Sequence, residues 1–114
     1  MPSTDPGVYA VNLITLRPGV AVDEFARFSA ELDQPTCLAQ EVVRGFDVYA
    51  VTRDEQRGSR RAIDVVEAMH VASWSEWERV RDGLPAMRPV VEGFGRLVPD
   101  DGVRTLFASR VHPR

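Results

Sequence analysis

The order in which two kinds of apolar segment follow one another limits the folds open to this chain. Four segments rich in β-branched residues are typical of strands: residues 7–17, 45–53, 62–71 and 103–112. Two segments with apolar side chains at helical spacing are typical of helices: residues 22–32 and 73–97. Polar residues 54–61 connect the second and third strands as a hairpin. This β-α-β-β-α-β order predicts one ferredoxin-like α+β domain, residues 1–114, with a four-stranded antiparallel sheet and helices on one face.

The predicted helices have recognisable ends. Asp23 is placed to cap the first turn of the first helix. That helix should end before Pro35, because the residue preceding a proline avoids helical geometry. Ser73, followed by Glu76 three positions later, forms a capping box at the start of the second helical segment. Gly83 then breaks this segment into two helical pieces.

This arrangement leaves one face of the sheet without helices. The first and third strands nevertheless read as apolar on both faces, so the uncovered face must pack against another surface. The economical partner is a second copy of the chain across a two-fold axis. We therefore expect a homodimer of the dimeric α/β-barrel type, with a mostly apolar cavity enclosed between the sheet and the partner subunit.

Composition excludes several classes of function. The net charge of −3 gives no electrostatic basis for binding nucleic acid or an anionic membrane. We expect neither a membrane span nor a secretion signal, since no apolar run approaches ~18–20 residues and the N-terminus lacks the signal pattern. One cysteine forms no internal disulfide, which predicts a cytoplasmic protein. All fourteen basic residues are arginines, so lysine-dependent Schiff-base catalysis is excluded.

Two residues of the third predicted strand are candidates for proton transfer. Glu67 lies in mid-strand among apolar neighbours, and burial there would raise its pKa toward neutrality. The alternative is a partly exposed glutamate paired with an arginine. His70 lies at the end of the strand and, three positions on, points to the opposite face. It would either shuttle a proton near the mouth of the cavity or cap the second helix.

Two polar residues on other strands are candidates for substrate binding. Asn12 interrupts the apolar first strand, where an unpaired polar side chain costs about 1–3 kcal/mol. A hydrogen-bond partner across the sheet is one explanation, and orientation of a substrate carbonyl is the other. Tyr49 lies on the more polar side of the second strand, where it would offer a hydroxyl or a stacking surface, or simply be an amphipathic strand residue.

The segment after the first helix holds two further candidates. Asp33 either ends the helix or belongs to a site, and Cys37 is either a small buried apolar residue or a working thiol. The chain has two widely separated histidines, His70 and His112, and no paired cysteines, so we expect no metal. It also lacks a glycine-rich phosphate loop following a strand.

These motifs together resemble a known family. The segments "LITLRPGV" (residues 13–20), "DQPTC" (residues 33–37) and "IDVVEAMHV" (residues 63–71) make the chain similar to the RedY-like, HapK-type proteins of bacterial secondary-metabolite clusters. These are small members of the dimeric α/β-barrel superfamily. In the resemblance Glu67 corresponds to a family glutamate, while His70 stands where relatives tend to have another acidic residue.

The resemblance implies an enzyme without a cofactor that steers cyclisation or coupling of a reactive aromatic intermediate, such as an indole, bisindole or pyrrole. From expected burial and side-chain chemistry, rather than from the resemblance, we expect Glu67, His70 and Asp33 to be catalytic and Asn12, Tyr49 and Cys37 to bind substrate. Asp33 and Cys37 would stand at the rim where the substrate enters. Upstream pathway enzymes are possible partners. The alternatives are a cofactor-free monooxygenase of the same barrel type and a non-catalytic module that binds a pathway intermediate.

Overall fold

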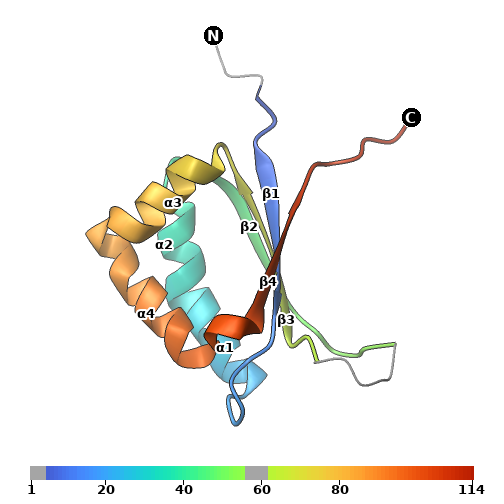
Figure 1. Ribbon diagram of the computed structural model, residues 1–114, viewed down its shortest axis with the longest axis vertical. Helices are drawn as coiled ribbons and strands as arrows, with labels where there is room; N and C mark the ends of the chain where they lie inside the picture. Colours follow the sequence, from blue (N-terminus) through green and yellow to red (C-terminus); the bar gives the residue numbers. More distant parts are fainter. Residues whose placement is uncertain (1–4, 56–61) are drawn as a thin grey trace.

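The structure is a computed structural model that describes residues 5–55 and 62–114. Its strands are antiparallel in the order β2-β3-β1-β4, and its helices pack on one face of that sheet (Figure 1). The strands are β1 (Val8–Ile14), β2 (Val43–Ala50), β3 (Val65–Val71) and β4 (Val103–Ala108). The helices are α1 (Val22–Phe28), α2 (Gln34–Leu38), α3 (Trp74–Gly83) and α4 (Arg88–Leu97). The predicted ferredoxin-like β-α-β-β-α-β fold is confirmed.

The strands are shorter than the apolar segments predicted. The third strand begins at Val65 rather than at residue 62, because Asp64 is used to close the end of β1. Its backbone N–H donates to the carbonyl of Ile14, and its carboxylate accepts from the backbone N–H of Leu16 at 2.8 Å. Most of the predicted hairpin connection, residues 54–61, lies outside the described residues.

The prediction that the first helix ends before Pro35 is wrong. Helical structure runs from α1 through a π-helical turn, Ser29–Asp33, directly into α2. The N–H of Gln34 donates to the carbonyl of Ser29, five residues earlier. A proline inside a regular α-helix lacks an N–H and clashes with the carbonyl four residues before it. The wider turn placed immediately before Pro35 lets the helix continue past that obstacle.

The two predicted helix starts have different outcomes. Ser73 does cap α3, with its Oγ accepting from the N–H of Glu76 at 3.4 Å, as the capping box predicted. The prediction for Asp23 is wrong, because the N-cap of α1 is Ala21 and no side chain caps it. Asp23 lies inside the first turn, where its charge favours the positive end of the helix dipole.

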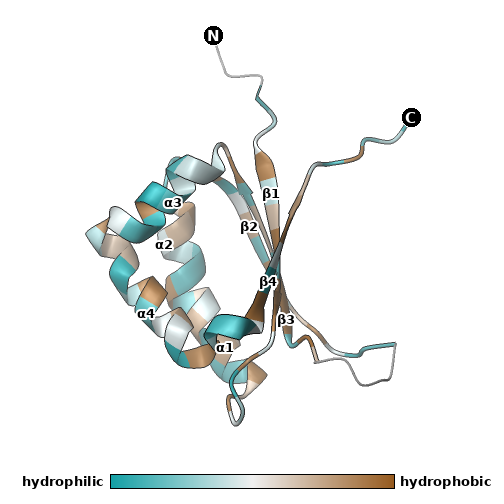
Figure 2. Cartoon of the chain, viewed as in Figure 1, coloured by the Kyte–Doolittle hydropathy of each residue, from teal (hydrophilic) through white to brown (hydrophobic). Residues whose placement is uncertain are grey.

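The core lies between the helices and the sheet. One buried cluster joins Phe46 and Met69 on the strands to Trp77 and Met87 on the helical side. A second cluster is centred on Phe25, which makes edge-to-face contacts with neighbouring rings. Figure 2 shows hydrophobic residues along β1 and β4 as well as on the helices. Within the described residues, no helix is long and apolar enough to cross a membrane.

The opposite face of the sheet carries no helix. Alternation along the strands gives it a set of half-buried side chains that are mostly apolar. They belong to the two central strands: Tyr9, Val11, Leu13, Val66, Ala68 and His70. This is the apolar second face that the sequence predicted for these strands, and we call it the open face.

Candidate active site

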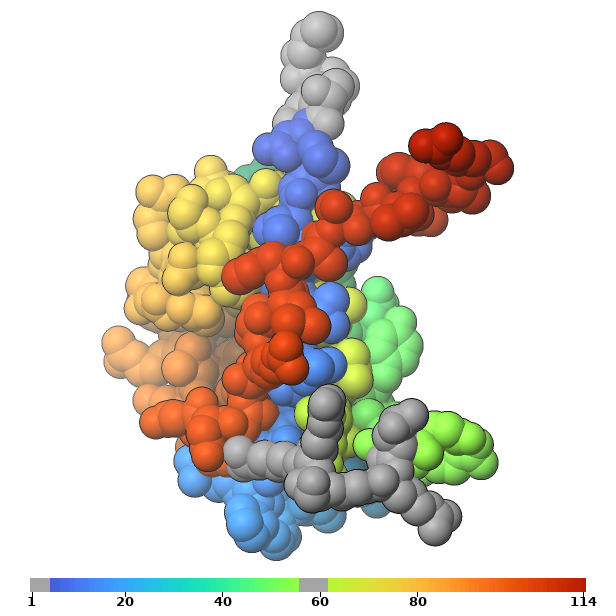
Figure 3. Space-filling model, turned by 45° about the vertical axis from the view of Figure 1, so that its right-hand side comes forward, coloured from blue at the N-terminus to red at the C-terminus, as the bar shows by residue number. Residues whose placement is uncertain are grey.

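A cavity of about 280 Å³ lies between the sheet and its own helices. It is lined mainly by apolar side chains, and its polar lining residues are few: Asn12, Asp33, Glu67, Arg81 and Thr105. Its more exposed lining residues, Val91 and Thr105, belong to α4 and β4. In Figure 3 β4, in red, runs beside the yellow and orange surface of α3 and α4, and the cavity opens between these walls.

The expected position of the cavity, between the sheet and a partner subunit, is therefore wrong for the site that contains Glu67. The alternation of side chains along β3 shows on which face of the sheet Glu67 lies. Glu67 shares a face with Val65 and Met69, which are buried under the helices. Its cross-strand neighbour Asn12 lies on the same face. Both polar side chains consequently point toward the helices of their own chain.

Three strands position the carboxyl group of Glu67. Asn12 is directly opposite Glu67 on β1, and Thr105 is directly opposite Asn12 on β4. The Thr105 hydroxyl donates to Asn12 Oδ1 at 2.7 Å, and Asn12 Nδ2 donates to Glu67 Oε1 at 3.1 Å. Asn12 thus has the cross-sheet partner that was one of its two predicted explanations. The hydrogen-bond chain fixes the orientation of one oxygen of the carboxyl group.

The other oxygen of Glu67 has no such partner. Oε2 is buried, and it makes no hydrogen bond to any residue in the described ranges 5–55 and 62–114. The pKa of Glu67 is raised from 4.5 to about 8, mainly by burial and also by the nearby Asp33, while the Asn12 hydrogen bond acts in the opposite direction. At neutral pH the group is therefore mostly protonated and able to donate its proton.

The π-helical turn brings a second carboxyl group to the cavity. Asp33 is 5% exposed, and its Oδ1 accepts a hydrogen bond from Cys37 Sγ at 3.2 Å. Burial raises the pKa of Asp33 from 3.8 to about 6, with the thiol hydrogen bond acting in the opposite direction. Asp33 does not end the helix, and it is mostly ionised at neutral pH.

Cys37 serves as a donor to Asp33. It is 1% exposed, and burial together with the neighbouring carboxylates raises the pKa of its thiol far above the ordinary value. The thiolate required of a nucleophile is thereby disfavoured. The expectation that Asp33 and Cys37 stand at the rim is wrong, because the continuous helix carries both into the interior.

His70 and Tyr49 do not line this cavity. The ring of His70 stacks on Tyr9 with centroids 4.1 Å apart, and its Nε2 lies 2.7 Å from the carbonyl oxygen of Pro6. The prediction that His70 points away from Glu67 is confirmed. Tyr49 is 58% exposed. Within one chain, the structure does not bring either side chain together with Glu67 and Asp33.

Several lining residues were not recognised as site residues from the sequence, among them Thr105, Trp74, Trp77 and Arg81. Thr105 is found only once the pairing of β4 with β1 is known. Trp74 and Trp77 follow the Ser73 cap and read as ordinary helix residues. The sequence does hold one signal that could have identified the residues of α3: two tryptophans and an arginine follow the capping box at helical spacing, so they share one face of the helix.

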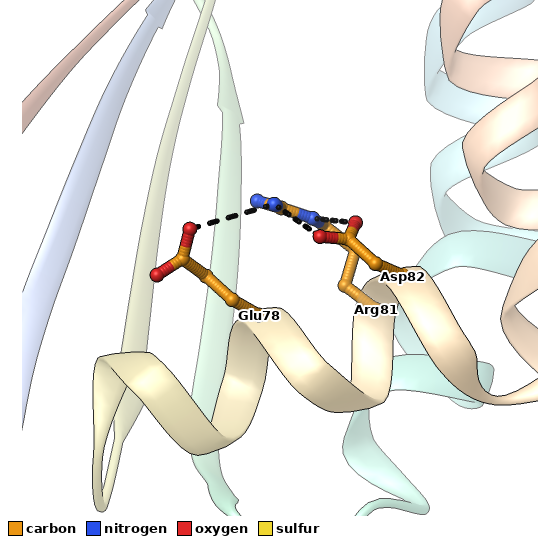
Figure 4. A network of polar contacts seen from close by, with 3 residues as sticks. All are labelled: Glu78, Arg81 and Asp82. Atoms are coloured by element: carbon orange, nitrogen blue, oxygen red, sulfur yellow. Dashed lines mark hydrogen bonds and ion pairs between the residues drawn. The ribbon is translucent and has the colours of Figure 1, made fainter.

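Arg81 on α3 is the only basic residue among those that line the cavity in the described chain. Its guanidinium is occupied by carboxylates of its own helix, as Figure 4 shows. Nε and Nη2 contact Asp82 at 2.9 and 3.2 Å, and Nη2 lies 3.8 Å from Glu78. Among residues 5–55 and 62–114, no three metal-ligating side chains come together.

Residues 8–111 match the family model described as REDY-like protein HapK. The chain is similar in structure to HapK from Hahella chejuensis, with 18% identity and a TM-score of 0.72 over 94% of this chain and 95% of that one. The resemblance noted in the sequence is thereby confirmed. No curated protein sequence matches the chain.

Two further solved structures share the fold. One is a dimeric ferredoxin-like protein of unknown function from Thermobifida fusca YX, with 13% identity and a TM-score of 0.65 over 91% of each chain. The other is the hydroxynitrile lyase from Passiflora edulis, with 6% identity and a TM-score of 0.68 over 96% of this chain and 98% of that one. At such identities the likeness shows the fold alone.

Proposed function

We propose, on the premise that this chain belongs to the REDY-like protein HapK family, that it is an enzyme of bacterial natural-product biosynthesis. It acts without a cofactor and steers cyclisation or coupling of a reactive aromatic intermediate. The observation that carries the proposal is the pair of carboxyl groups, Glu67 and Asp33, that line one apolar cavity with pKa values near 8 and 6.

The two groups suit opposite roles in proton transfer. Environments that separate the pKa values of two neighbouring acids assign one as acid and the other as base. Protonated Glu67 gives its proton to the electrophilic partner, an imine nitrogen or a carbonyl oxygen, as the new bond forms. Ionised Asp33 removes a proton from the aromatic nucleophile. One proton is gained and one lost, so the step is redox-neutral.

The walls of the cavity support an aromatic substrate. Phe46, Trp74, Trp77 and Phe94 offer flat surfaces, and Met87 adds a deformable thioether. A volume of about 280 Å³ lies just below the usual range for ligand sites, which begins at about 300 Å³, and suits a small ligand. Exclusion of water by these side chains keeps a reactive intermediate from spontaneous side reactions.

The test is the product distribution formed from a reactive aromatic precursor with and without the protein. We expect Glu67→Gln to abolish the effect of the protein, because the amide has no acidic proton, while folding and dimer formation persist. Glu24→Gln, the same change on an exposed position of α1, is the matched control and should act like the natural chain. Full activity in the Glu67→Gln variant would refute the role of this residue.

Two other outcomes identify the alternatives. Oxygen consumed in proportion to product would indicate a monooxygenase. Saturable ligand binding with the same products in the presence and absence of the protein would indicate a binding module. Either result would replace the proposed cyclisation or coupling.

A further inference from the structure

The charges around the cavity do not balance. Glu67 and Asp33 both line it, and the groups that influence the Glu67 carboxyl are Asp33 and Asn12, neither of which is a cation. Arg81 is directed to Asp82 and Glu78, which already supply more negative charge than it carries positive charge (Figure 4). An anionic ligand would therefore meet two acids and an arginine that is already paired.

One buried polar atom of the cavity lining has no hydrogen-bond partner within the described part of the chain. It is Oε2 of Glu67, a residue that is 3% exposed. A buried polar atom without a hydrogen bond has lost its contacts with water and gained none in return, which is unfavourable. A ligand that places an N–H group beside Oε2 removes that cost and, if the nitrogen is charged, also supplies the missing positive charge.

The walls favour the same kind of ligand. Trp74 and Trp77 come from α3, and Phe94 comes from α4, so rings from two helices line the same cavity as Glu67. Indole and phenyl faces attract both flat aromatic rings and cations. A flat ring would lie among them while a nitrogen reaches the carboxyl group.

From these observations we propose that the cavity binds a planar heteroaromatic compound bearing a basic nitrogen, held as a cation with its N–H directed to Oε2 of Glu67. This rests on the proposed function only for the aromatic class of the substrate. Its charge follows from the unbalanced acids. In the proposed coupling step the same ion pair forms when Glu67 passes its proton to a neutral imine nitrogen.

Binding of a cation should be accompanied by release of a proton. A ligand that is already protonated in solution pairs with ionised Glu67, so the proton of Glu67 leaves for solvent. The other titratable groups around the cavity are Asp33 on the π-helical turn, Cys37 on α2 and Arg81 on α3, while β1, β4 and α4 contribute none to its lining. We expect about one proton to be released per ligand near neutral pH, and affinity to rise as pH increases toward 8.

Three probes with one ring system and different charges test the inference: tryptamine, a cation; tryptophol, a neutral alcohol of the same length; and indoleacetate, an anion. Calorimetric titration in two buffers of different ionisation enthalpy gives both affinity and proton release. We expect tryptamine to bind roughly tenfold or more tightly than tryptophol, and indoleacetate to bind most weakly. Equal affinities, or tightest binding of indoleacetate, would overturn the proposal.

Variants locate the charge that the ligand recognises. Glu67→Gln should remove both the preference for tryptamine and the proton release, whereas Glu24→Gln should retain both. Arg81→Gln should leave the preference in place. A preference that survives in Glu67→Gln would place the recognition elsewhere and refute the assignment.

Failure of this inference and failure of the proposed function are distinguishable. Tryptamine preference without any effect on products supports the inference and refutes the catalytic role. An effect on products that depends on Glu67, with no preference among the probes, leaves the catalytic role standing and refutes the cationic ligand.

Discussion

Glu67 and Asp33 keep their protons more tightly in the folded chain than in the unfolded chain, and each therefore makes stability depend on pH. The pKa of Glu67 rises from 4.5 to about 8 on folding, and that of Asp33 from 3.8 to about 6. Between the unfolded and folded values, the folded chain binds the proton and the unfolded chain releases it. The free energy of unfolding consequently falls as pH rises from about 4 to about 8.

Glu67→Gln tests this pH dependence of the free energy of unfolding at one residue. The amide resembles the protonated acid, so the variant and the natural chain should be similar in stability near pH 4. Near pH 9 the variant should be more stable by roughly 2–4 kcal/mol. Urea unfolding across this range measures the difference, with Glu24→Gln as the exposed control. Parallel stability curves for Glu67→Gln and the natural chain would contradict the burial of an ionisable group here.

The rate of the proposed reaction should also depend on both acids. It needs Asp33 ionised and Glu67 protonated, so the pH profile should be bell-shaped with limbs near 6 and 8. Because the Cys37 thiol lowers the pKa of Asp33, Cys37→Ala should move the acidic limb to higher pH while activity persists. Initial rates measured from pH 5 to 9 would reveal the shift. Complete loss of activity in folded Cys37→Ala would instead assign the thiol a direct role.

At the scale of elements, periodicity in the sequence was enough to predict the strands, the helices and their order, because these depend on local pattern. The passage of the helix through Pro35 was not predictable, because Ser29 and Asp33 of the π-helical turn are buried by tertiary packing, which the local sequence pattern does not reveal. Glu67 was recognised from its apolar neighbours, and Asn12 from its place in an apolar strand. Thr105 was missed because only strand register brings it to Asn12.

Close packing of α4 on the first helix gives an element-scale prediction. A Cβ added at Gly93 would lie 2.5 Å from Cε1 of Phe28, while one added at Gly95 meets nothing within 4 Å. Gly93→Ala should therefore destabilise the chain by about 1–3 kcal/mol, because the Phe28 ring must move. Gly95→Ala should stabilise it by about 0.5–1 kcal/mol through helix propensity. Thermal unfolding compares the two, and equal effects would contradict the described packing.

At the scale of the whole molecule, the open face is the surface still without a partner. Val11 and Leu13 lie at its centre on β1, and Leu106, opposite Val11 on β4, is 42% exposed. We propose that a second copy of the chain covers this face, because its side chains are mostly apolar. The solved ferredoxin-like structure from Thermobifida fusca, which shares the fold, is described as dimeric. The natural chain should then have twice its monomer mass of 12.7 kDa in light scattering.

Separating the subunits tests whether the dimer is needed for the cavity. Val11→Asp places a charge in the proposed interface and should yield monomers, whereas Leu38→Asp, at an exposed position on α2, should remain dimeric. Because Glu67 and Asp33 face helices of their own chain, a folded monomer should still bind tryptamine with its preference intact. Dilution of the natural chain below its dimer dissociation constant provides the same test without a mutation. Loss of ligand binding together with loss of the dimer would mean that the partner subunit completes the site.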